Sequence, residues 1–180
     1  TPQQEADMDI KATLNNLLIP YTSNYAGTLL PGIREYTVTP GEKTTSISGK
    51  GKAGLKQEEN YYFFYLPVCY KGITGKSYAY YNTSRSKNLY LPASVDENYS
   101  YDIQLPENLT LCTPIQEKKI DNPIGSFKIT LTSEGSSLHI ELALQIKKQL
   151  ITPAEYPAFR SLITEWTDRT RKPILFKTVQ

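Results

Sequence analysis

The sequence has few of the residues that carry most metal and nucleophile chemistry. It holds one His, two Cys and one Met among 180 residues. A metal site built from several His and Cys ligands cannot be assembled from so few residues, and we predict no metal and no cofactor. Two cysteines in a chain of this length also exclude a small domain held together mainly by disulfides.

An excess of positive charge is also missing. Lys and Arg number 20 against 18 Asp and Glu, which gives a formal net charge of +2. Strong nucleic-acid binding depends on a basic surplus that neutralises phosphates. We therefore predict no nucleic-acid partner.

Long apolar runs are absent. The densest are residues 17–19 and 61–66, far short of the roughly 20 residues that a membrane helix needs. We predict no membrane span. The chain begins at Thr1 without Met or an apolar secretory segment, so we expect a mature or excised fragment.

The two cysteines each end an apolar stretch. Cys69 follows residues 66–68 and Cys112 follows residues 109–111. Two buried free thiols that pack as small apolar groups are the simplest interpretation; a single disulfide in an exported protein is the alternative. Nucleophilic use of either would need His139 beside it, with an orienting acid, and we expect His139 to be an exposed strand residue.

Alternation of apolar and polar residues predicts a protein made mainly of β-strands. It is clearest over residues 138–147, and residues 8–18 show it too, although they also fit a helical face. Further strands are predicted at residues 33–38, 43–48, 61–67, 78–81, 89–91, 99–105, 109–113, 126–131 and 174–177. Short turns rather than crossover helices join these segments, which favours an antiparallel two-layer β-sandwich.

One α-helix is predicted at about residues 153–171, packed on the sandwich. Thr152 and Glu155 form a capping box, with Thr152 as N-cap and Pro153 at the first helical position. Pro157 removes an early backbone donor, so the regular helix is expected to begin a few residues later. The apolar stripe that should face the sheet consists of Tyr156, Phe159, Ile163 and Trp166.

Other polar segments have ordinary structural interpretations. Residues 49–54 are rich in Gly and Lys, and we expect a solvated hairpin tip, because the strand, helix and Gly-Lys-Ser/Thr ending of a phosphate-binding loop are missing. Residues 61–67 are large and apolar on both faces, which predicts a central strand between two layers. The acidic pairs at residues 58–59 and 96–97 are expected in loops, as solvated charges.

Tyrosine, by contrast, is abundant, with 14 in the chain. Exposed aromatic rings can stack on sugars or peptides while the hydroxyl hydrogen-bonds. The residues proposed for such a surface are Tyr61, Tyr62, Tyr78, Tyr80, Tyr81 and Tyr90. The competing interpretation is that Tyr is a favoured strand residue, part buried with its hydroxyl at the rim.

Short motifs in the second half of the chain occur in a characteristic order. They are residues 85–92, 99–106, 121–127, 151–160 and 173–177. Together they resemble the C-terminal module of exported bacterial proteins with a transglutaminase-like core. In that family a Cys-His-Asp core lies between an N-terminal β-domain and a C-terminal domain of unknown function.

The resemblance implies that the chemistry lies upstream of this chain. The family's catalytic residues belong to the core, and nothing here matches their motifs. Cys69 is followed by Tyr70, Lys71 and Gly72, without the Trp expected after that type of nucleophile. We therefore predict no catalytic residue in this chain.

Two functional hypotheses follow. The first is a non-catalytic accessory domain of an exported, periplasmic or cell-surface protein, which scaffolds the upstream domains or positions a polymeric substrate. The second is a carbohydrate- or peptide-binding module that uses the tyrosines. We treat residues 1–180 as a single domain, and a subdivision into 1–84 and 85–180 is also compatible with the sequence.

Overall fold

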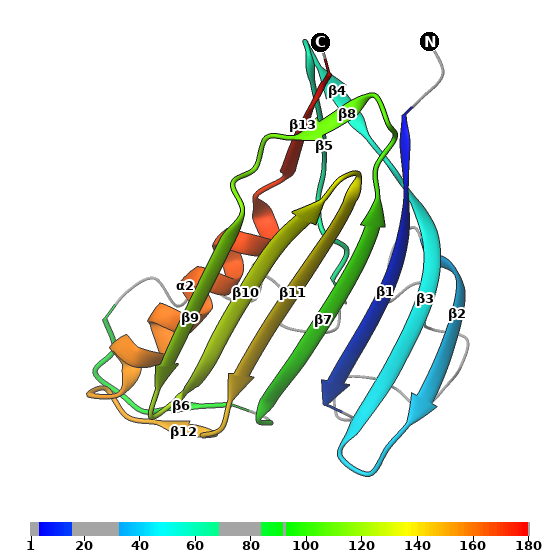
Figure 1. Cartoon of the computed structure of the whole chain (residues 1–180). Helices are drawn as coiled ribbons and strands as arrows, with labels where there is room; N and C mark the ends of the chain where they lie inside the picture. Colours follow the sequence, from blue (N-terminus) through cyan, green and yellow to red (C-terminus); the bar gives the residue numbers. More distant parts are fainter. Residues whose placement is uncertain (1–3, 16–32, 69–83, 92, 180) are drawn as a thin grey trace.

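The computed structural model describes residues 4–15, 33–68, 84–91 and 93–179. These residues form three antiparallel β-sheets and one α-helix (Figure 1). The predicted strand at residues 78–81 lies outside the described residues. The fold class predicted from the sequence, mainly β with antiparallel pairing and one helix, is confirmed and is consistent with a β-sandwich.

The largest sheet has seven strands and forms one layer of the molecule. Their order is β2 (Ile33–Pro40), β3 (Thr44–Gly54), β1 (Glu5–Asn15), β7 (Val95–Gln104), β11 (Ser137–Ile146), β10 (Gly125–Glu134) and β9 (Gln116–Asn122). Every neighbouring pair is antiparallel. Strands from both sides of residue 84 therefore share one sheet, because β1 pairs with β7 along residues 7–14.

Two smaller sheets lie at opposite ends of the large one (Figure 1). The four-stranded sheet has the order β4 (Lys56–Glu58), β5 (Tyr61–Phe64), β13 (Ile174–Thr178) and β8 (Leu109–Leu111). The two-stranded sheet pairs β12 (Leu150–Ile151) with β6 (Leu89–Tyr90).

The core is built on one face of the large sheet, which we call the inner face. Alternate side chains of the long strands are buried there, as the burial of β1, β7, β10 and β11 shows. Helix α2 (Tyr156–Arg171) packs against β10 and β11. Its fully buried Trp166 lies 6.0 Å from the ring centre of Tyr99 on β7, so the predicted apolar stripe of the helix does face the sheet.

The start of α2 modifies the predicted capping. The backbone N–H of Thr152 donates to Glu155 Oε2 at 3.0 Å, and the N–H of Glu155 donates to Thr152 Oγ1 at 3.3 Å, so the reciprocal capping-box bonds form. The N-cap is nevertheless Glu155 rather than Thr152, and Pro157 lies in the first helical positions. The prediction of a later helix start is confirmed, because a turn precedes the regular helix.

The prediction of a hairpin tip at residues 49–54 is wrong, since these residues form the second half of β3 between β1 and β2. Gly49 lies where neighbouring side chains leave no room. A Cβ there would come within 2.4 Å of Ile33 Cγ2. Gly49 therefore reflects close packing against the neighbouring strand β2 rather than the flexibility of a loop.

The expectation for residues 96–97 is also wrong. Both lie in β7, and Glu97 is fully buried between Leu14 and Leu144. Its Oε2 accepts a hydrogen bond from the Tyr99 hydroxyl at 3.0 Å. Burial, and then the charge of Glu97, raise the pKa of Tyr101 well above its ordinary value.

One prediction about strand position is wrong, and one strand was missed. Residues 61–67 were expected between two layers, but β5 belongs to the small sheet and Tyr61 stays largely exposed. Strand β9 was not predicted at all. It is a charged edge strand with both faces mostly accessible, so it carries no apolar alternation.

Candidate functional site

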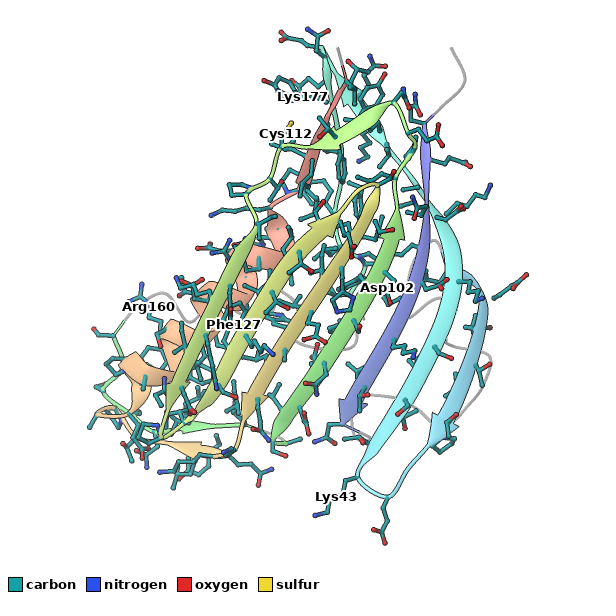
Figure 2. The ribbon with its side chains drawn as sticks, viewed as in Figure 1. Lys43, Asp102, Cys112, Phe127, Arg160 and Lys177 are labelled. Carbon is teal, nitrogen blue, oxygen red and sulfur yellow. The ribbon has the colours of Figure 1, made fainter. Side chains whose placement is uncertain are left out.

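A row of polar side chains crosses the outer face of the seven-stranded sheet. Strand register places one residue from each of five neighbouring strands directly opposite the next. The row runs Lys50, Asp9, Asp102, His139 and Thr132 across β3, β1, β7, β11 and β10. This face lies opposite the one on which α2 packs over β10 and β11 (Figure 2).

Within this row, His139 is held between two carboxylates. Its Nδ1 lies 2.7 Å from Asp102 Oδ1, and its Nε2 lies 3.5 Å from Glu141 Oε1. The hydrogen bond to Asp102 is the main cause that raises the pKa of His139 above its ordinary value, and Glu141 adds to it. The arrangement therefore favours an imidazolium ion bonded to Asp102.

An open depression of about 470 Å³ lies beside His139 on this face. Asp7, Asp9 and Asp102 line it, together with Gln104 and Ser137, whose hydroxyl donates to Gln104 Oε1 at 2.9 Å. Its walls are therefore mainly acidic and polar. Such a surface suits a cationic or hydrogen-bonding group rather than an anion.

The Asp–His pair has the geometry of an oriented base, but among the described residues no cysteine lines this depression. Cys112 carries a free, half-buried thiol just after β8 in the small sheet, so the predicted burial of this residue is only partial. Figure 2 shows Cys112 at the small-sheet end and Asp102 along the large sheet. Cys69 lies outside the described residues, and within those residues no three His, Cys, Asp or Glu side chains are arranged to hold a metal ion.

Sequence reasoning placed His139 and Asp102 on the outward positions of their strands but did not bring them together. The alternation of residues 99–105 and 138–147 is the signal that both face the same way. Their contact depends on the register of β7 against β11, which pairs residues 37 positions apart. Strand register is not readable from either segment alone.

The structure separates the tyrosines of the proposed binding surface. Tyr61 and Tyr62 lie on β5, whereas Tyr90 lies on β6 at the opposite end of the molecule (Figure 1). Tyr90 is 72% exposed, while Tyr62 is half-buried against the core. Tyr78, Tyr80 and Tyr81 lie outside the described residues.

A smaller aromatic strip is formed at β5 instead. Tyr61, Phe63 and Tyr65 occupy alternate positions, so they face one side of the small sheet. Tyr61 and Tyr65 are 48% and 45% exposed. Phe63 and Tyr65 meet edge to face with ring centres 6.2 Å apart, and Lys56 Nζ lies 5.9 Å from the Tyr65 ring centre.

Comparison with known proteins gives a family and one solved structure. A sequence model of the family described as "Domain of Unknown Function with solved-structure structure (DUF3858)" matches residues 60–176. A crystal structure described as that of "a putative protease from Parabacteroides distasonis ATCC 8503" is similar, with 32% sequence identity and a TM-score of 0.58. That match covers 67% of this chain and 24% of the other, and no curated protein matches.

The family match begins at residue 60, but the seven-stranded sheet also contains strands that precede this residue. Strands β1, β2 and β3 all precede the matched segment, and β1 occupies a central position beside β7.

The described part of the chain contains no helix long and apolar enough to span a membrane.

Proposed function

Because this chain belongs to the DUF3858 family of domains of unknown function, we propose that it is a non-catalytic accessory β-domain of a larger exported protein. The larger protein would carry a transglutaminase-like or protease-like core upstream. The domain would scaffold that core or position a polymeric substrate. The observation that carries the proposal is the match to only 24% of a chain described as "a putative protease", which leaves ample sequence elsewhere in that chain for a catalytic domain.

The arrangement of the described residues supports a role without catalysis. His139 already has Asp102 and Glu141 as partners, and Cys112 lies in a different sheet. A Cys–His nucleophilic pair needs the two side chains within hydrogen-bond reach. The described part of the chain does not bring Cys112 into such a pair.

The complete gene product gives the test. Its sequence upstream of Thr1 is expected to contain a Cys-His-Asp core, and substitution of that cysteine should abolish hydrolysis of a fluorogenic peptide. The double variant Cys112→Ser and His139→Gln in this domain should keep turnover within about twofold. A folded double variant without turnover, or a complete reading frame without an upstream core, would overturn the proposal.

A second candidate is a carbohydrate- or peptide-binding module, and the strip of exposed Tyr61 and Tyr65 with half-buried Phe63 favours it. Binding of the chain to glycan and peptide arrays would reveal a ligand. Tyr61→Ala and Tyr65→Ala should then abolish the signal, whereas Tyr90→Ala, at the other end of the molecule, should not. Equal losses in all three variants would count against the strip as the binding surface.

A further inference from the structure

A groove on the side of α2 combines two arginines with an apolar floor. It measures about 560 Å³, and its walls come from the first half of α2, from β9 and from the segment that precedes β6. The lining residues used below are Arg85, Ile120, Tyr156, Arg160, Ser161 and Thr164. Figure 2 labels Arg160 on α2.

Arg85 is fixed in the groove but lacks a hydrogen-bond acceptor. Its guanidinium carbon lies 5.8 Å from the ring centre of Tyr156, so the planar group rests near a buried aromatic ring. Its Nε is buried, and no residue of the described chain accepts a hydrogen bond from it. A buried N–H without an acceptor destabilises the protein, and a ligand oxygen in the groove would supply the missing acceptor.

The positive charge of the groove is not neutralised by its one acidic neighbour. Glu165 lies at the groove but already forms ion pairs with Lys118 and with Arg169, whose Nε is 3.8 Å from Glu165 Oε2. Among the described residues, neither Arg85 nor Arg160 has an acidic partner within ion-pair distance. Two guanidinium groups are therefore available to one anionic ligand.

The remaining walls define what else the ligand carries. Arg160, Ser161 and Thr164 lie on one side of α2, because residues three and four apart share a helix face. The Ser161 hydroxyl donates to the Ala158 carbonyl at 2.9 Å, which leaves its oxygen free to accept. Ile120, Tyr156 and two prolines supply the apolar surface.

We propose that this groove binds a carboxylate attached to an apolar group, as in a short acidic peptide segment. Arg85 offers a planar pair of donors that matches a carboxylate in bidentate geometry, and Arg160 supplies a second charge. The apolar part of the ligand lies against Ile120 and Tyr156. This site is separate from the His139 depression, whose acidic walls repel the same ligand.

Four probes applied to the full 180-residue chain at low salt distinguish the sources of the carboxylate. Acetyl-Phe-Glu-amide has only a side-chain carboxylate, and acetyl-Phe-Leu has only a C-terminal one. Acetyl-Phe-Gln-amide is neutral, and inorganic phosphate has no apolar part. Binding is followed by the amide NMR shifts of Ser161 and Thr164. At least one carboxylate peptide is expected to bind about tenfold or more tightly than the neutral peptide and phosphate.

Three variants test whether Arg85 and Arg160 are responsible for binding the carboxylate peptide. Arg85→Gln and Arg160→Gln should each weaken binding of the carboxylate peptide about tenfold or more. Arg171→Gln, at the exposed C-terminal end of the same helix, should leave the affinity unchanged. Arg160 is itself exposed, so its variant tests the proposal even if Arg85→Gln unfolds. Equal weakening by Arg171→Gln, equal binding of the neutral peptide or of phosphate, or no binding of either carboxylate peptide would overturn the proposal.

Discussion

The two faces of the seven-stranded sheet come from the same strands but differ in what they contribute. The inner face is mainly apolar and packs in part against α2, and Phe127 and Tyr101 are fully buried on it. The outer face carries exposed charges that pair across strands, such as Asp102 with His139. Buried apolar area dominates folding energy, whereas exposed ion pairs contribute about 0–1 kcal/mol. Stability thus depends on the inner face, and the outer face is free to vary with function.

The most severe test of this comparison uses two adjacent residues of β10. Phe127 faces the core and Lys128 faces solvent, 3.6 Å from Glu141. Phe127→Ala should reduce the free energy of unfolding by about 3–5 kcal/mol through lost burial and the cavity left behind. Lys128→Ala should cost less than about 1 kcal/mol. Urea unfolding measures both, and similar losses would show that the two faces do not differ as described.

A second test uses adjacent residues of β3. Gly49→Ala should destabilise the fold by about 1–3 kcal/mol, because the new Cβ would overlap Ile33 Cγ2. In a protein that already carries Ile33→Ala, the additional cost of Gly49→Ala should be smaller than in the wild type, because the overlapping methyl is then gone. Lys50→Ala, on the outer face, should have little effect. Strict additivity in the double-mutant cycle would contradict the proposed contact.

The smallest expected effect concerns the outer face itself. Asp102→Asn removes the carboxylate that is the main cause of the raised pKa of His139, so this pKa should fall toward its ordinary value of about 6.5. NMR titration of the imidazole ring measures the change. A pKa that stays raised would mean that Asp102 is not its cause.

The same pair has a defined effect on stability. A histidine whose pKa is raised by folding stabilises the protein below its unfolded pKa, and this contribution is lost as pH rises through the folded value. Its size should stay below about 1 kcal/mol, because the His139 side chain is 41% exposed. The free energies of unfolding of the wild type and of Asp102→Asn should therefore differ more at pH 5 than at pH 9.

Much of the fold was predictable because the signals are local. The alternation in β7, β10 and β11 identified the strands and their buried sides, and the spacing of Phe159, Ile163 and Trp166 identified the buried stripe of α2. The failures lie where local signals mislead. β9 is a charged edge strand, Gly49 of β3 indicates close packing, and Glu97 is a polar residue inside the core.

The candidate sites were less predictable than the fold. Asp102 and His139 could be assigned to outward positions, but only the pairing of β7 with β11 makes them neighbours. Arg85 begins one of the short motifs that sequence analysis used only for a family resemblance, and only the packing of that segment against α2 places it near Tyr156. In both cases the partners are distant in sequence.

By itself, the sequence determined the mainly β class, the terminal helix and the inward face of most long strands. These follow from side-chain periodicity within single segments, which the backbone geometry of strands and helices dictates. Only the tertiary structure decided that β1 lies between β3 and β7, that His139 meets two carboxylates, and that two arginines share a groove beside α2. Those contacts join residues tens of positions apart, and their register and packing are set by the fold as a whole.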